Sequence, residues 1–202
     1  MKLGVFGGTF DPIHNGHLAV ADEVREELNM DRVLFVPTGQ PWLKSDRPIT
    51  AAKHRVEMVR LAITGRAYCQ MSMIEIERKG PSYTLDTMAE LWKRLGDGDE
   101  QFFIMGWGSL NELPQWREPE RIIRLCRLVA VPRLGYPRPD LKSLEKSIPG
   151  ISQRVIILER PQVDISASDI RERVSRGLSI SGLVPEAVER YIREGGLYKT
   201  GS

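Results

Sequence analysis

The sequence predicts an α/β protein built on a doubly wound parallel sheet, with a small helical subdomain toward the C-terminal end. Short, almost continuously apolar runs alternate with longer segments of helical periodicity, which is typical of parallel strands joined by helices. After Val163 the apolar runs stop and only helical segments follow. The 202 residues match the length of one α/β domain with a single core.

Apolar runs mark the expected strands, and the segments between them mark the expected helices. The strands are predicted at Leu3–Phe6, Val33–Val36, Met71–Ile76, Phe102–Met105, Leu128–Val131 and Val155–Leu158. The helices are predicted at His17–Leu28, Ala51–Thr64, Thr84–Leu95 and Pro119–Leu125. Thr50 is placed to cap the second helix, and we expect Arg55 to lie on the outward polar face of that helix.

The helical subdomain begins, by this prediction, directly after Val163. The chain then divides into an α/β domain over residues 1–163, the subdomain over 164–198 and a frayed tail over 199–202. Helices are expected over roughly Ser168–Arg176 and Pro185–Gly195. Proline at the start of the last helix and glycine at its end follow the usual preferences of helix termini.

Composition argues against several classes of protein. The chain is 41% hydrophobic and 28% charged, with 29 basic and 27 acidic residues and a net charge of +2. This balance gives no electrostatic case for a nucleic-acid or membrane partner. No apolar run approaches the roughly 20 residues of a spanning helix, and no signal peptide precedes Gly4, so we expect a cytoplasmic protein. Cys69 and Cys126 are isolated, which favours buried thiols in a reducing compartment.

The most informative segment follows the first predicted strand. There Gly7–Pro12 (GGTFDP) leads into His14–His17 (HNGH). This order places backbone N–H groups, a hydroxyl and two imidazoles at the carboxyl end of a strand, where open α/β sheets bind ligands. The start of the following helix adds partial positive charge. The segment therefore predicts a phosphate site, although it matches neither G-x-G-x-x-G nor G-x-x-x-x-G-K-[ST].

The two histidines have alternative explanations. At a spacing of three they could share a helix face and bind a metal ion. A metal site needs further ligands, however, and the third histidine, His54, lies in a separate segment without Cys or His nearby. We therefore expect no metal held by side chains of the protein. A purely structural histidine pair is the other alternative.

A second segment, Asp164–Arg171 (DISASDIR), opens the first helix of the predicted subdomain. Ser166 or Ser168 is a natural N-cap, and Arg171 lies one turn into the helix, near its positive end. Taken alone, this segment is equally consistent with a capped helix that binds nothing.

Together the two segments resemble the signatures of the HxGH nucleotidyltransferase superfamily, whose members transfer a nucleotidyl group from a nucleoside triphosphate to a phosphate acceptor. Ile165–Arg171 is similar to the ISSTxxR signature of that superfamily. The resemblance implies a Rossmann-like fold, with the histidines around the ATP phosphates and the arginine as a charged clamp. The residues that it implies for ATP are Gly7, Gly8, Thr9, Phe10, His14, His17, Gly106, Ile165, Ser168 and Arg171.

Three further segments, Phe35–Lys44, Glu75–Thr87 and Phe103–Trp116, make the chain resemble the bacterial nicotinate-mononucleotide adenylyltransferase family. The resemblance runs from Gly4 to Tyr198 and is most specific in the SYTLDT block that starts at Ser82. It implies ATP and nicotinate mononucleotide as substrates and Mg²⁺ bridging the phosphates. The implied catalytic residues are His14, His17, Lys44 and Arg171, and the implied mononucleotide residues are Lys44, Tyr83, Thr84 and Trp116.

Two positions depart from the family pattern. Gly108 stands where the family usually has the aspartate of Gly-Ala-Asp, and Leu43 stands where a histidine commonly precedes the lysine. The missing carboxylate lies beside the nucleotide in the family, so its loss predicts weaker affinity or turnover. Gly108→Asp is then expected to raise activity if position 108 faces the site.

Other functions stay open at this point. The acceptor could be nicotinamide mononucleotide or pantetheine phosphate, or the chain could bind nucleotide with weakened catalysis. A class I aminoacyl-tRNA synthetase shares an HxGH-type turn, but it would need a longer chain and a KMSKS-like loop. Homo-oligomers are common among enzymes, yet nothing in the sequence specifies one.

Overall fold

The core of the protein is a six-stranded sheet in which every neighbouring pair of strands is parallel. The computed structural model describes residues 1–41 and 48–199. The strands are β1 (Lys2–Gly8), β2 (Arg32–Pro37), β4 (Cys69–Met71), β6 (Glu100–Gly106), β7 (Arg127–Val131) and β8 (Val155–Ile157). Their order across the sheet is β4-β2-β1-β6-β7-β8, so the direction of winding reverses between β1 and β6. Doubly wound sheets bind their ligands at this switch point.

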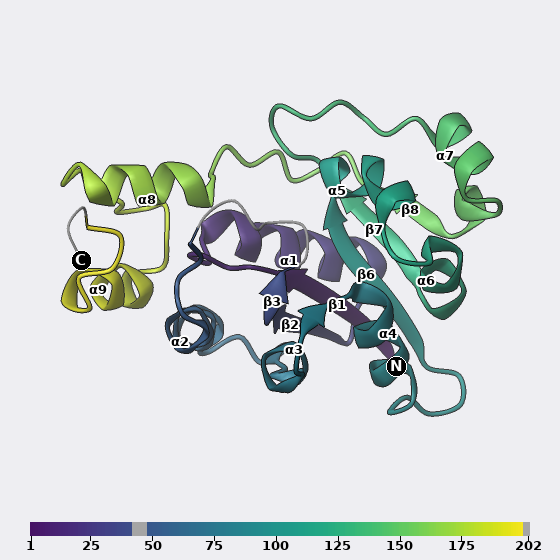
Figure 1. The fold of residues 1–202 in the computed structure, drawn as a ribbon, viewed down its shortest axis with the longest axis horizontal. Helices are drawn as coiled ribbons and strands as arrows, with labels where there is room; N and C mark the ends of the chain where they lie inside the picture. The colour runs from purple at the N-terminus through teal and green to yellow at the C-terminus, as the bar shows by residue number, and fades with distance from the viewer. Residues whose placement is uncertain (42–47, 200–202) are drawn as a thin grey trace.

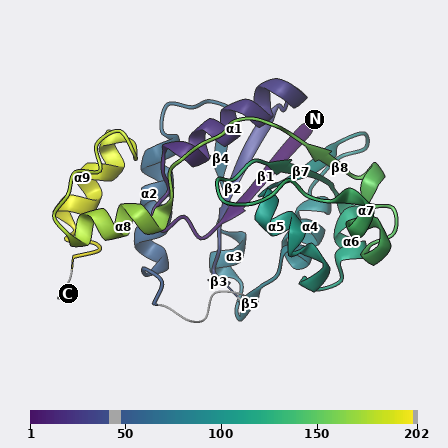
Figure 2. The ribbon, with the colours of Figure 1, turned by 90° about the horizontal axis from the view of Figure 1, so that it is seen from above.

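Helices cover both faces of the sheet (Figures 1 and 2). On one face α1 (Asn15–Leu28) and α2 (Ala52–Ile63) pack on the strands, and on the other face lie α4 (Thr84–Trp92), α5 (Trp107–Asn111) and α6 (Pro119–Leu125). Along β2, Val33 and Phe35 enter the first hydrophobic cluster, whereas Leu34 and Val36 enter the second. This alternation follows from the two-residue repeat of a strand, and it explains why the strands are continuously apolar. The Rossmann-like fold is confirmed.

Helices α8 (Ala167–Ser175) and α9 (Glu186–Glu194) lie together beyond α2, at the left of Figure 1. Their buried residues Ile170, Val188 and Ile192 belong to the hydrophobic cluster that α1 and α2 also form. Across this contact His54 Nδ1 and the Tyr191 hydroxyl are 2.9 Å apart. The two helices therefore share a core with the sheet, and the expected domain boundary after Val163 stays a prediction.

The predicted strand at Met71–Ile76 is wrong after its first residue. The strand ends at Met71, and α3 (Ile74–Glu77) follows as a short helix. The Ser72 hydroxyl accepts a hydrogen bond from the Ile74 N–H at 3.3 Å, which turns the chain away from the sheet. α7 (Leu141–Ser147) and two 3₁₀ turns, Leu113–Gln115 and Ile151–Gln153, were not expected from the sequence.

Both expectations at the start of α2 are wrong. The helix begins after Ala51, and the side chain of Thr50 does not cap it. Arg55 is not on the outward face but is buried, with 2% of its surface exposed. Its guanidinium donates to the carbonyl oxygens of Thr50 at 2.9 Å, Thr9 at 2.8 Å and Gly39 at 3.4 Å. These three backbone acceptors, which come from loops, explain how the charge is tolerated inside.

Cys69 and Cys126 are free and buried, as the sequence predicted. Among the described residues, no helix has the length and apolar character needed to cross a bilayer.

Candidate active site

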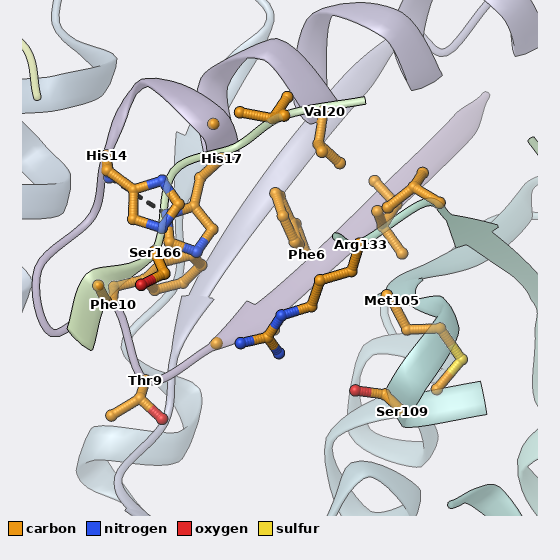
Figure 3. A pocket seen from close by; sticks show the side chains of 18 of the residues that line it. Phe6, Thr9, Phe10, His14, His17, Val20, Met105, Ser109, Arg133 and Ser166 are labelled. Atoms are coloured by element: carbon orange, nitrogen blue, oxygen red, sulfur yellow. Dashed lines mark hydrogen bonds between the residues drawn. The ribbon is translucent and has the colours of Figure 1, made fainter. Parts of the chain in front are cut away.

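A cavity of about 270 Å³ opens at the switch point of the sheet (Figure 3). Its base is formed by the carboxyl ends of the two central strands, Phe6–Gly8 of β1 and Phe103–Gly106 of β6. The turn after β1, the first residues of α1 and the loop after β7 complete it from the sides. Of the residues predicted for ATP, those that line the cavity are Gly7, Gly8, Thr9, Phe10, His14, His17, Gly106 and Ile165.

The turn between β1 and α1 depends on two close approaches. A Cβ atom at Gly8 would lie 3.0 Å from the Phe10 ring, and one at Gly16 would lie 2.9 Å from Val163 Cγ1. Phe10 has a positive φ of 49° and is buried against Phe6, with an edge-to-face ring distance of 5.9 Å. The glycines therefore leave room for the ring of Phe10 to pack beneath the turn, while the backbone of residues 7–9 faces the cavity.

The two histidines form one unit at the start of α1. His14 is the N-cap residue, and its N–H donates to His17 Nδ1 at 3.2 Å. This hydrogen bond fixes the neutral form of His17 with its proton on Nε2. The rings stack with centroids 3.7 Å apart. Burial lowers the pKa of His14 to about 4, and the positive charge of Arg133 adds to this shift. His14 is thus a neutral hydrogen-bonding group at physiological pH.

Arg133 is a cavity residue that sequence reasoning missed. It lies two residues after the end of β7 and extends toward the phosphate turn (Figure 3). Its guanidinium lies over the ring of Tyr136, 5.1 Å from the ring centroid. A cation at this edge of the sheet suits a polyphosphate ligand. The available signal was its position two residues after a predicted strand, at the carboxyl edge of the sheet.

The segment that resembles ISSTxxR reaches the cavity through its first residues. Ile165, Ser166 and Ala167 line it, and the Ser166 hydroxyl caps α8 by accepting from the Asp169 N–H at 3.1 Å. Ser168 and Arg171 are not among the described lining residues. Arg171 instead donates through Nη1 to the Asp11 carbonyl at 2.6 Å and through Nη2 to Ser168 Oγ at 3.1 Å. Its contact with phosphate stays a prediction.

The residues predicted for the mononucleotide are only partly brought together. Trp116 lines the cavity, its ring packs edge-on against Phe103 at 6.0 Å, and its buried Nε1 has no hydrogen-bond partner in the described part of the chain. Tyr83 and Thr84 start α4 outside the cavity lining. The ring of Tyr83 lies 4.9 Å from the guanidinium of Arg117, the neighbour of Trp116.

Lys44 and Leu43 lie outside the described residues. The segment before them forms β3 (Gln40–Pro41), which pairs with β5 (Pro81–Ser82). Through this pairing, the residues just before the Leu43–Lys44 segment lie beside the start of the SYTLDT block.

The environment of Gly108 differs from what the family pattern suggests. A Cβ atom there would lie 2.5 Å from Cδ1 of Tyr136, because the tyrosine ring occupies the space next to the glycine. Real Cβ atoms do not approach other atoms so closely, so any side chain at position 108 requires Tyr136 to move. Tyr136 thus stands beside the position where the family has its carboxylate.

Carboxylates are sparse around this cavity. Within residues 1–41 and 48–199, no three His, Cys, Asp or Glu side chains are grouped so that they could hold a metal ion. Asp11 lines the cavity, but its carboxylate accepts hydrogen bonds from Tyr198 and from the Thr50 N–H.

Comparison with known proteins places this chain in a family. The sequence model of the cytidylyltransferase-like family matches residues 5–173. A probable nicotinate-nucleotide adenylyltransferase of Dehalococcoides mccartyi is 50% identical over 198 residues, which cover 98% of this chain and 97% of the relative. The corresponding protein of Thermomicrobium roseum is 46% identical over 199 residues, or 98% of this chain and 92% of the relative.

A solved structure of Plasmodium falciparum nicotinic acid mononucleotide adenylyltransferase complexed with NaAD superposes with a TM-score of 0.77. The two sequences are 19% identical, and the match covers 98% of this chain and 97% of the other, so this likeness supports the fold. The family model and the close relatives carry the assignment: the chain belongs to the cytidylyltransferase-like family and, within it, to the nicotinate-nucleotide adenylyltransferases.

Proposed function

We propose that this protein transfers the adenylyl group of ATP to nicotinate mononucleotide, giving nicotinate adenine dinucleotide and pyrophosphate in NAD biosynthesis. The observation that carries the proposal is the stacked pair of His14 and His17 at the N-terminus of α1, facing a cavity at the switch point. Family membership supplies the acceptor, since the relatives are named for nicotinate nucleotide.

The phosphates of ATP are assigned to the turn after β1. Backbone N–H groups around Gly8 and Thr9 and the positive end of α1 favour an anion there. His17 donates from Nε2 toward the α-phosphate, and Arg133 supplies positive charge from the opposite side of the cavity. Ser168 and Arg171 complete the site from α8.

The reaction needs positioned charge rather than a base. An oxygen of the 5′-phosphate of the mononucleotide attacks the α-phosphorus of ATP, and the bond from that phosphorus to the bridging oxygen breaks. Pyrophosphate leaves with the electron pair of that bond. Because the attacking oxygen is already anionic, no proton has to be removed from it, and catalysis rests on alignment and charge stabilisation.

The acceptor is assigned to the side of the cavity where Trp116 lies. Stacking of the pyridine ring on the indole is worth roughly 0.5–1.5 kcal/mol beyond the buried area. The indole of Trp116 lines this side of the cavity, and its buried Nε1 has no hydrogen-bond partner among the described residues. Tyr83, Thr84 and Lys44 frame the mononucleotide by the family resemblance.

Mg²⁺ enters this scheme as part of the substrate. The described residues offer no carboxylate cluster, and Mg²⁺ bound to the ATP phosphates would supply positive charge to them. The two buried thiols, Cys69 and Cys126, support a reducing compartment, and we propose the cytoplasm. Self-association stays a prediction.

The proposal is tested by measuring pyrophosphate release from MgATP with nicotinate mononucleotide and nicotinamide mononucleotide in parallel. We expect turnover with preference for the acid. Preference for the amide would reassign the acceptor. ATP binding without pyrophosphate release from either acceptor would contradict the enzymatic function and favour a nucleotide-binding protein.

A pair of variants tests the histidine assignment. His17→Ala is expected to lower kcat by on the order of 10²–10³, the effect of removing one donor that stabilises developing charge. His54→Ala is the matched control, because this third histidine faces Tyr191 and not the cavity. Near-normal turnover of His17→Ala, or an equal loss in both variants, would remove His17 from the catalytic site.

A further inference from the structure

The carboxylate of Asp11 is the meeting point of segments that are remote in the sequence. Asp11 lines the cavity within the phosphate turn, yet only 3% of its surface is exposed. The Tyr198 hydroxyl donates to Oδ1 at 2.8 Å, and the Thr50 N–H donates to Oδ2 at 3.4 Å. Arg171 donates to the Asp11 carbonyl at 2.6 Å. The side chain of Asp11 therefore acts as a hydrogen-bond acceptor for other segments of the chain.

The C-terminal segment holds the start of α1 as well. The Asn15 N–H donates to the Leu183 carbonyl at 2.9 Å, and the Asn15 side chain donates to the Gly182 carbonyl at 2.8 Å. The residues between these anchors include His14. Both ends of the phosphate turn are thus tied to the same C-terminal part of the chain.

The turn needs such support because its conformation is not one that the chain favours locally. Phe10, directly before Asp11, has a positive φ of 49°, a region that side chains other than glycine, asparagine and aspartate rarely adopt. Arg55, which is buried on α2, donates to the Thr9 carbonyl at 2.8 Å. The backbone that faces the cavity is therefore shaped by contacts made on its outer side.

We propose that Tyr198 is a positioning residue for ATP: its hydroxyl fixes Asp11 and thereby the backbone and histidines that receive the phosphates. This inference rests on the proposed function, since it assigns ATP to that turn. By this inference the C-terminal segment shapes the nucleotide site although it does not touch the nucleotide. Burial and the charge of Asp11 raise the pKa of Tyr198, so the hydroxyl remains protonated and donates throughout the neutral range.

Tyr198→Phe separates this role from simple packing, because it keeps the ring against the core and removes only the donor. We expect the Kd of a non-hydrolysable MgATP analogue, measured by calorimetry, to rise about 10-fold or more, as for a lost hydrogen bond to a buried charge. The KM for the mononucleotide is expected to stay within about 2-fold.

Tyr191→Phe is the matched control. It removes a tyrosine hydroxyl from the same C-terminal segment, but that hydroxyl faces His54 on α2. Unchanged ATP affinity in Tyr191→Phe together with weakened affinity in Tyr198→Phe is the expected pattern. Wild-type ATP affinity in Tyr198→Phe, or equal weakening in both variants, would overturn the positioning role.

Hydrogen exchange on the wild-type protein tests the same inference without relying on a variant that must fold. Binding of the ATP analogue is expected to slow amide exchange in residues 8–14 and in residues 196–199 together. Slowing confined to the turn would overturn the coupling. Because both measurements use binding, they still decide the role of Tyr198 if neither mononucleotide supports turnover and the proposed function fails.

Discussion

Replacing Gly108 by aspartate is the perturbation for which the structure reverses the expectation from sequence. The family pattern alone predicts that the restored carboxylate raises activity. In the structure, however, the new Cβ would lie 2.5 Å from Cδ1 and 2.6 Å from Cε1 of Tyr136. Since Tyr136 is 42% exposed and lies in a surface loop, its ring can move to make room, but it then loses its contact with the guanidinium of Arg133.

The cost of that displacement can be worked out from the contact that is lost. The guanidinium of Arg133 lies 5.1 Å from the ring centroid of Tyr136, and a cation–π contact at an exposed site is worth about 0.5–1 kcal/mol. Losing it lets Arg133 move away from the cavity, so we expect the KM for ATP in Gly108→Asp to rise about 2- to 5-fold. The carboxylate also adds a negative charge next to a polyphosphate site.

The assay is pyrophosphate release at varied ATP, run on Gly108→Asp, Tyr136→Ser and the double variant. With the ring removed, the aspartate displaces nothing, so the part of its penalty that comes from moving Tyr136 should disappear in the Tyr136→Ser background and only the effect of the added charge should remain. A higher kcat/KM in the single Gly108→Asp variant would refute this reasoning. So would a penalty of equal size in both backgrounds.

Three further predictions follow from buried groups of the site. The pKa of His14 is about 4 instead of its usual 6.5, so between these pH values the unfolded chain binds a proton that the folded chain does not. The contribution of His14 to the free energy of unfolding should therefore fall by about 3 kcal/mol as the pH drops from 6.5 to 4. Denaturant unfolding at the two pH values should show this decrease in the wild type and not in His14→Asn. Arg55→Met should lower the free energy of unfolding by about 2–4 kcal/mol, because three partly buried carbonyls lose their donor; a thermal midpoint equal to that of the wild type would contradict this. Trp116→Ala should raise the KM for the mononucleotide about 2- to 12-fold and leave the KM for ATP unchanged. A rise confined to the KM for ATP would show that the indole contacts ATP and not the mononucleotide.

Much of the fold could be predicted because the strands are buried on both faces. Such strands read as unbroken apolar runs, and five of the six were located to within about two residues. In the sixth run, Met71–Ile76, the apolar residue Met71 ends a strand, whereas Ile74 and Ile76 belong to a helix. A buried helical turn and a buried strand cannot be told apart by hydrophobicity over so few residues.

The site was predictable where its residues are neighbours in sequence, and less so elsewhere. The turn after β1 carries its own glycines and histidines, so its location at the cavity followed from the strand before it. Arg133 enters only because β7 lies beside β6, and Arg55 only because loops from three places present carbonyls to it. A charged side chain is expected outside unless those partners are known, and they are not local.

The hydrogen bond from Tyr198 to Asp11 joins residues 187 positions apart, and that from Arg171 joins residues 160 positions apart. During synthesis Asp11 leaves the ribosome long before either partner exists. A chain interrupted just before residue 170 would contain all six strands of the sheet but neither of these two donors. It would also lack Ile170, Val188 and Ile192, which share a hydrophobic cluster with α1 and α2, so the last part of the chain completes the core and the phosphate turn together.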